Sequence, residues 1–341
     1  MDDRKYRILM AIIDDYIMTA MPVGSRTISK RQEIGGLSSA TIRNEMSDLE
    51  ELGFLDQPHT SAGRIPSSKA YRLYVEQLLQ GAHKLPAEEA RRLRNHFDKR
   101  ARQVEAVILS AAQAISDVTR YTAVVTLPKA QSVHIRRIQL VPVTENTALL
   151  LVVTDLGIIK DTVIPVDGQL TPDHLHEISK TLTEQLAGLP VDLVREKLME
   201  ISGAFHKQRQ MLQGILEAVE EAGQGPQGIM VGGRSNLLHY PEYSDAEKAR
   251  AVLAVLETRD KLLQLMQAAP KMAFTIRIGD ETGIPETSGC SVVSMTYRIG
   301  DETAGTIGVI GPTRMQYARV IPVLDYMGKA LSELLSDIGP G

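Results

Sequence analysis

One segment, residues 23–66, constrains the fold of this 341-residue chain more than any other part; its sequence is VGSRTISKRQEIGGLSSATIRNEMSDLEELGFLDQPHTSAGRIP. Its pattern predicts two short helices around the turn Gly35-Gly36, then a strand from Phe54 and a hairpin. Ser38 or Ser39 can cap the second helix, which ends at Gly53. This order of elements is typical of a winged helix-turn-helix, which places one helix in the major groove of DNA.

The second of these helices has one apolar and one polar face. Ile42, Met46 and Leu49 follow helical spacing and are expected to face a core. The opposite face carries small and hydrogen-bonding side chains: Ser39, Ala40, Thr41, Arg43, Asn44 and Ser47. An arginine can bind a guanine edge and an asparagine an adenine edge. An ordinary amphipathic helix would show the same pattern, so this helix alone leaves both readings open.

Two flanking segments favour the DNA-binding interpretation. The segment His59-Thr60-Ser61-Ala62-Gly63-Arg64 is expected to form the tip of the hairpin, and it contains no Asp or Glu. Its arginine can reach a minor groove or a phosphate. Ser25-Arg26-Thr27, at the start of the first short helix, can hold a second phosphate. Each segment alone could be plain turn chemistry. The residues predicted to contact DNA are Ser25, Arg26, Thr27, Ser38, Ser39, Thr41, Arg43, Asn44, Ser47, His59, Thr60, Ser61 and Arg64.

Charge and composition limit how such a segment can act. Residues 1–80 hold ten Lys or Arg and eleven Asp or Glu, a net charge of −1, which argues against general coating of nucleic acid. A single cysteine, Cys290, excludes an intramolecular disulfide and suits a reducing cytoplasm. The chain has no signal-peptide pattern and no apolar stretch of membrane-spanning length, so we expect a cytoplasmic protein without a membrane partner.

The rest of the chain reads as strands, then helices, then strands again, which predicts an α+β domain interrupted by an insertion. A linker at 81–87 precedes one long helix at 87–117. Strands are expected at 122–127, 133–143, 147–154 and 157–166, helices at 172–188, 191–199 and 204–222, further strands at 229–231, 272–279, 290–299 and 304–310, and a last helix at 313–337.

Residues 22–75 resemble the heat-inducible transcription repressor HrcA family of bacteria; their sequence is PVGSRTISKRQEIGGLSSATIRNEMSDLEELGFLDQPHTSAGRIPSSKAYRLYV. The resemblance continues at Gly311-Pro312-Thr313-Arg314-Met315, at IGDE (278–281), and at SNLL with the following PEYSD (235–245). It implies a multidomain α+β chain: a winged-helix domain at 1–80, a linker at 81–87, a GAF-like domain at 88–155 and 245–341, and an inserted dimerisation domain at 156–244.

The same resemblance implies a function and partners. Members repress chaperone operons as homodimers on an inverted-repeat operator of double-stranded DNA, and the GroEL chaperonin is thought to maintain their activity. Two rival functions stay open. One is a ligand-sensing regulator with a small molecule in the GAF-like domain, although its aliphatic strands favour a packed core. The other is a scaffold whose winged helix binds protein.

The remaining motifs favour structure over chemistry. Gly311-Pro312-Thr313 is best read as a strand-to-helix junction, with Thr313 as the cap and Arg314 bound to a carboxylate such as Glu281; an anion site at the helix start is the alternative. No P-loop, zinc-ligand spacing or nucleophile elbow occurs in the sequence. We therefore expect no enzyme activity, cofactor or metal.

Overall fold

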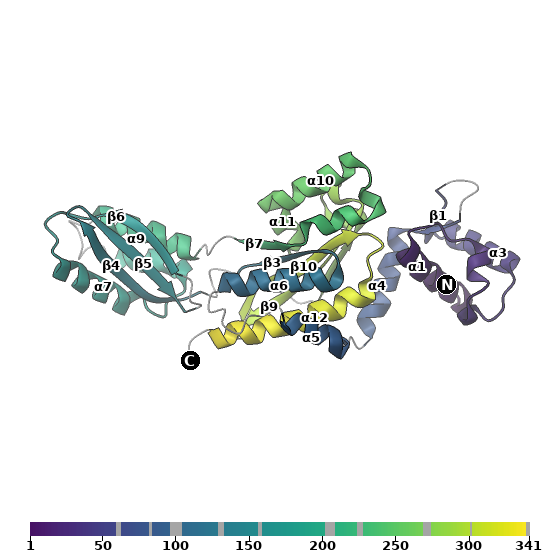
Figure 1. Cartoon of the computed structure of the whole chain (residues 1–341), viewed down its shortest axis with the longest axis horizontal. Helices are drawn as coiled ribbons and strands as arrows, with labels where there is room; N and C mark the ends of the chain where they lie inside the picture. Colours follow the sequence, from purple (N-terminus) through teal and green to yellow (C-terminus); the bar gives the residue numbers. More distant parts are fainter. Residues whose placement is uncertain are drawn as a thin grey trace.

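The computed structural model describes residues 1–58, 63–81, 84–95, 104–128, 133–155, 159–201, 209–223, 228–268, 274–300 and 302–338. These residues form a mixed α/β structure with three units in a row along the longest axis (Figure 1). We term them the head (residues 1–81), the body (84–128 and 228–338) and the insert (133–223). Within the described part, no helix combines the length and apolar character needed to cross a membrane.

The head consists of helices around an aliphatic core and one small antiparallel sheet. Asp2 caps the first helix and Ser38 caps α3, where its hydroxyl accepts a hydrogen bond from the Thr41 amide at 3.1 Å. Ile12, Ile42 and Leu49 are fully buried between α1 and α3. The elements of the head are α1 (Asp3–Thr19), α2 (Ser25–Ile28), η1 (Gln32–Ile34), α3 (Ser39–Glu51), β1 (Leu55–Asp56), β2 (Ile65–Pro66) and α4 (Ser68–Gln80).

The body is a five-stranded antiparallel sheet, in the order β7-β3-β10-β9-β8, with helices on both faces (Figure 1). Alternation along β3 explains this: Ala123 and Val125 join the core under α6 and α12, whereas Val124 joins the core under α10 and α11. The strands are β3 (Thr122–Thr126), β7 (Ile229–Gly232), β8 (Thr275–Ile278), β9 (Cys290–Ile299) and β10 (Glu302–Pro312). The helices are α5 (Ala87–Asn95), α6 (Val104–Thr119), α10 (Ala246–Glu257), α11 (Arg259–Met266) and α12 (Tyr317–Ile338), with short turns η5 (Arg234–His239), η6 (Pro241–Tyr243), η7 (Gly279–Thr282) and η8 (Pro285–Thr287).

The insert carries a separate three-stranded antiparallel sheet in the order β4-β5-β6. Helix α7 packs on β4, and α9 packs on β5 and β6. Both helices cover the face that holds Ile138, Leu150 and Ile164, which are buried. The elements are β4 (Ile135–Thr144), β5 (Thr147–Thr154), β6 (Ile159–Pro165), α7 (Pro172–Leu186), η3 (Val191–Leu193), α8 (Val194–Ile201) and α9 (Arg209–Gly223).

The predicted limits of the insertion, 156 and 244, are wrong. Strands β4 and β5 are expected in the interrupted domain, yet β5 pairs with β4 on one side and with β6 on the other, in a separate sheet. At the other end β7 pairs with β3 of the body, with Val124 opposite Val231. The insertion therefore lies between Thr126 and Ile229. Alternation in the sequence identifies a strand, but its partner depends on contacts about a hundred residues away along the chain.

Two helix predictions also need correction. The single helix expected at 87–117 is two helices, α5 and α6, and residues 96–103 lie outside the described part. The last helix begins at Tyr317, because Gly311 and Pro312 still belong to β10. Thr313 consequently lies in the turn before α12 and is not its cap. Arg314 binds Glu242 rather than Glu281.

Candidate nucleic-acid interface

The exposed side of α3 carries most of the residues predicted to contact DNA. Arg43, Asn44 and Ser47 are exposed, and Ser39 and Thr41 are half-buried. Together with the exposed cap Ser38 they form a continuous polar surface, termed the α3 face. The Ser38 and Thr41 hydroxyl oxygens are 2.9 Å apart, so both polar groups sit beside the free amides of the first turn. That end of a helix attracts anions such as phosphate.

Two acids of α3, Glu45 and Asp48, pair with Lys5 of α1. Glu45 is only 8% exposed, and its carboxylate lies 3.0 Å from the ammonium group of Lys5 in α1. Asp48 lies 3.1 Å from the same ammonium group. Hydrogen bonds to Glu45 and Asp48 raise the pKa of Lys5, which stays charged. The negative charges of Glu45 and Asp48 are thus balanced within the head.

The three side chains of the segment Ser25-Arg26-Thr27 differ in their exposure to solvent. Arg26 and Thr27 are exposed, as a phosphate contact requires. Ser25 is only 8% exposed, so its side chain offers little accessible surface for the predicted phosphate contact. The cap of α2 is Gly24, which supplies no side chain. Helix α2 packs against α3, and its two exposed side chains therefore flank the α3 face.

Arg64 stands at the base of the hairpin and already has a partner. Its Nε and Nη2 atoms lie 2.8 and 2.7 Å from the same oxygen of Glu50 in α3. Its backbone exchanges two 2.9 Å hydrogen bonds with Val23. This arrangement fixes the hairpin to α3 and was not foreseen from the sequence. A phosphate contact by Arg64 stays a prediction that would compete with Glu50. His59, Thr60 and Ser61 lie outside the described residues.

The described titratable groups outside the head include one cysteine, Cys290, which is buried. Among the described residues, no group of three or more His, Cys, Asp or Glu could hold a metal ion. Burial raises the pKa of the Cys290 thiol to about 11, and the thiol lies 3.1 Å from the Tyr243 hydroxyl. A protonated, buried thiol is a structural group and a poor nucleophile.

Comparison with known proteins connects this architecture with transcription. A family model described as the HrcA protein C-terminal domain matches residues 105–321. A relative from Halalkalibacterium halodurans, named heat-inducible transcription repressor HrcA, is 41% identical over 340 residues and covers 98% of each chain. One of the same name from Acetivibrio thermocellus is 39% identical and covers 98% of this chain and 96% of the relative.

A solved structure agrees over the full length. The crystal structure of a hypothetical protein at 2.2 Å resolution aligns with a TM-score of 0.70 and 27% identity, covering 99% of this chain and 100% of that one. The curated matches define a class of protein, the transcription repressors. The chain belongs to the HrcA family of heat-inducible transcription repressors.

Proposed function

We propose that this chain represses heat-shock operons by binding an inverted-repeat DNA operator as a homodimer. The observation that carries the proposal is the α3 face, where Arg43 and Asn44 are exposed while Glu45 and Asp48 of the same helix pair with Lys5. In this proposal α2 and α3 form the helix-turn-helix, and the hairpin of β1 and β2 is the wing. Family membership supports the assignment to heat-shock genes.

The polar chemistry of the α3 face suits the major groove. Arg43 offers a bidentate donor for a guanine, and Asn44 offers a donor and an acceptor for an adenine. Ser39 and Ser47 are small enough for α3 to lie close to base edges, and Arg26 from α2 can bind a phosphate beside them. With a net charge of −1 over residues 1–80, one head has little general attraction for DNA. Affinity then has to come from two heads acting together.

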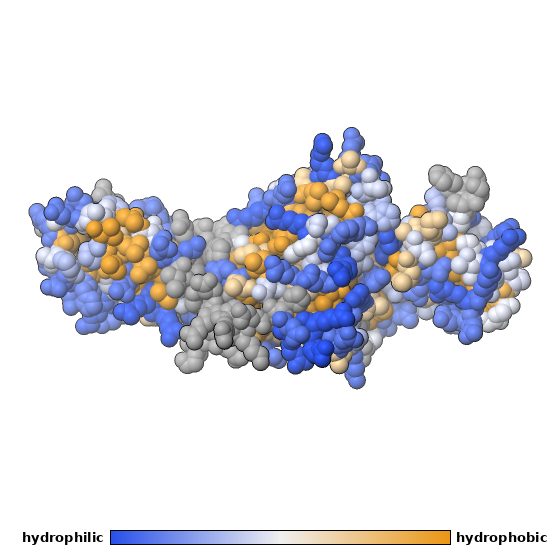
Figure 2. All heavy atoms as spheres, in the orientation of Figure 1, coloured by the Kyte–Doolittle hydropathy of each residue, from blue (hydrophilic) through white to orange (hydrophobic). Residues whose placement is uncertain are grey.

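The insert offers a surface for a second copy of the chain. The sheet face opposite α7 and α9 carries Val141, Leu149, Leu151, Val153 and Val163. Val141, Leu149 and Val163 are cross-strand neighbours, and Val163 is 57% exposed. Figure 2 shows a hydrophobic patch over the strands of the insert. A monomer seldom leaves such a patch in water, and two-fold packing of identical sheet faces would cover it.

Three further parts of the proposal rest on family membership. We assign the body to the GAF-like class and the protein to the cytoplasm, and we propose a GroEL-type chaperonin as a partner that keeps the repressor active. Addition of purified chaperonin should increase the fraction of protein that binds operator. An unchanged active fraction over a range of chaperonin concentrations would remove this partner from the proposal.

Footprinting of the full chain across its own promoter region tests the function. Two symmetric protected half-sites about one or two helical turns apart are expected, since a two-fold dimer reads a palindrome. Protection should disappear when the inverted repeat is scrambled. Absence of any protected site on DNA of this region, or protection that ignores the repeat, would contradict the proposal.

A further inference from the structure

Three sequence motifs take no part in the α3 face, yet they meet at one place in the fold. Arg314 follows β10, Glu242 belongs to η6, and Glu281 belongs to η7. All three side chains take part in polar contacts where the head meets the body. We term this region the joint.

Arg314 forms the first contact of the joint. It is only 8% exposed, and its Nη1 donates a 2.9 Å hydrogen bond to the Ile17 carbonyl oxygen in the last turn of α1. The same guanidinium binds both carboxylate oxygens of Glu242, with Nη2 to Oε2 at 3.1 Å. Its Cζ lies 5.7 Å from the centre of the Tyr240 ring, which stacks on Tyr121. Because the guanidinium is buried and bound at two oxygens of Glu242, it is held in one geometry. Its hydrogen bond to Ile17 therefore holds the end of α1 in a fixed position.

Arg72 of α4 forms the second contact. Its Nη2 donates to the Ile276 carbonyl oxygen of β8 at 2.8 Å, and its Nε donates to Glu281 at 3.2 Å. The backbone amide of Ile278 donates to Glu281 at 2.9 Å, so the carboxylate itself is held in place. Arg314 and Arg72 therefore attach two different helices of the head to two different parts of the body.

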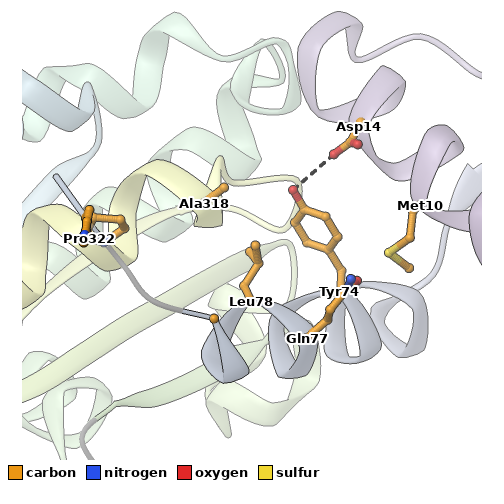
Figure 3. Close-up of a pocket in the computed structure, with 9 residues that line it drawn as sticks. Met10, Asp14, Tyr74, Gln77, Leu78, Ala318 and Pro322 are labelled. Atoms are coloured by element: carbon orange, nitrogen blue, oxygen red, sulfur yellow. Dashed lines mark hydrogen bonds between the residues drawn. The ribbon is translucent and has the colours of Figure 1, made fainter. Parts of the chain in front are cut away.

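Apolar packing alone does not fill the joint. A crevice of about 450 Å³ lies between α1, α4 and α12, with Asp14 and Tyr74 on the head side and Ala318 and Pro322 on the body side (Figure 3). The Tyr74 hydroxyl donates to Asp14 at 3.1 Å, which is a contact within the head. Tyr71 does contact Tyr317 across the joint, with ring centres 6.2 Å apart. Because one side of the joint is open, we expect the directional bonds of the two arginines to add to the apolar contact in fixing the angle of the head.

We propose that Arg314 and Arg72 are positioning residues that hold the head at one angle on the body. In a dimer this angle sets the distance between the two α3 faces, and therefore the half-site spacing that the protein accepts. The inference rests on the proposed function for its meaning, but the rigidity of the joint can be measured without DNA.

The first test measures the joint directly in the full chain. Spin labels are attached at Ser47→Cys in α3 and Glu257→Cys in α10, both exposed, while the native Cys290 is buried and stays unlabelled. Labelled chains are mixed with an excess of unlabelled chains, so that only distances within one chain are recorded. A single narrow distance distribution is expected, and Arg314→Ala with Arg72→Ala should broaden it.

Control variants separate the joint from general destabilisation. Arg92→Ala removes an exposed ion pair inside α5 and should leave the distribution narrow. Arg314→Lys keeps the charge but loses the bidentate geometry, so it should broaden the distribution even if the alanine variant fails to fold. A broad distribution in the unmodified chain, or a narrow one in the folded arginine variants, would overturn the proposal.

The second test uses operators that differ only in the spacing between half-sites. The unmodified protein should bind the operator with one half-site spacing tightly. The Arg314 and Arg72 variants should lose roughly tenfold in affinity for that operator, because a loosely held head lowers the effective concentration of the second contact. Their affinity for operators with other spacings should stay unchanged. Unchanged spacing selectivity would refute the positioning role. If the unmodified protein binds no operator at all, the proposed function fails, and the spin-label result still decides the rigidity of the joint.

Discussion

Arg43 and Asn44 are exposed on α3, so we propose these two side chains for base readout. Replacing either by alanine should lower discrimination between operator and scrambled DNA by about 1–3 kcal/mol, the typical loss for a bidentate base contact. Fluorescence anisotropy at one fixed salt concentration measures both affinities.

Two arginines serve as controls for that prediction. Arg26→Ala should weaken binding to both DNAs about equally, because a phosphate contact carries no base information. Arg94→Ala, an exposed arginine of α5 in the body, should change neither affinity. If neither Arg43→Ala nor Asn44→Ala alters discrimination, the α3 face does not read bases.

Asp14 makes stability depend on pH in an unusual direction. Burial raises the pKa of Asp14 above its ordinary value, although the Tyr74 hydroxyl partly opposes this. The charged form is thus disfavoured in the fold, and its cost grows as pH rises through the folded pKa. Asp14→Asn should raise the Tm at pH 8, and this gain should shrink as pH falls and the native carboxyl becomes protonated.

The neighbouring Asp15 provides the opposite case in the same experiment. Asp15 pairs with Arg31, so Asp15→Asn should lower the Tm at pH 8 by removing an ion-pair partner. Equal responses of the two variants at every pH would show that burial of Asp14 does not govern its titration.

Cys290 gives a simple check of the body. Its thiol is fully buried with a pKa raised to about 11, so the native protein should resist iodoacetamide at pH 8 and react once unfolded in guanidinium. Mass spectrometry counts the label. Rapid labelling of the native protein would show that the core between α10 and β9 opens readily.

At the scale of elements, sequence patterns predicted features within one helix or strand better than they predicted which elements pack together. The cap at Ser38 and the buried stripe of α3 follow from spacing within one helix, and the structure has both. The attachment of Arg64 to Glu50 could not be predicted, since it depends on how the hairpin returns to α3. The same limitation explains the misplaced insertion: β3 and β7 meet only after the whole insert has folded between them.

The hairpin of the head also depends on one close backbone approach. A Cβ atom at Gly63 would lie 2.4 Å from the Val23 carbonyl oxygen, and backbone cannot yield as a side chain does. Gly63→Ala should therefore destabilise the head by about 1–3 kcal/mol, the usual cost of overpacking. Denaturant unfolding measures this.

Gly24→Ala is the matched control for Gly63→Ala. Gly24 is adjacent to the same Val23, yet a Cβ there would meet nothing within 4 Å. Its replacement should stay within about 0.5 kcal/mol of the unmodified protein. Equal effects of the two substitutions would mean that the contact with Val23 is not what holds the hairpin.

For the molecule as a whole, the proposed dimer would form through the open sheet face of the insert. Leu149→Asp places a charge between Val141 and Val163 on this face and should convert a dimer into monomers in sedimentation velocity. Thr181→Asp adds the same charge on the exposed side of α7 and should leave the dimer intact. A dimer that survives Leu149→Asp would have to use another surface.

The central claim is that two α3 faces act together on one palindrome. The most direct measurement compares the full chain on the complete inverted repeat with the same DNA after one half-site is scrambled, recording both stoichiometry and affinity. Two chains per repeat and a loss of at least about 100-fold on the damaged repeat are expected, because the second contact is intramolecular. One chain per repeat, or equal affinity for the two DNAs, would contradict the account.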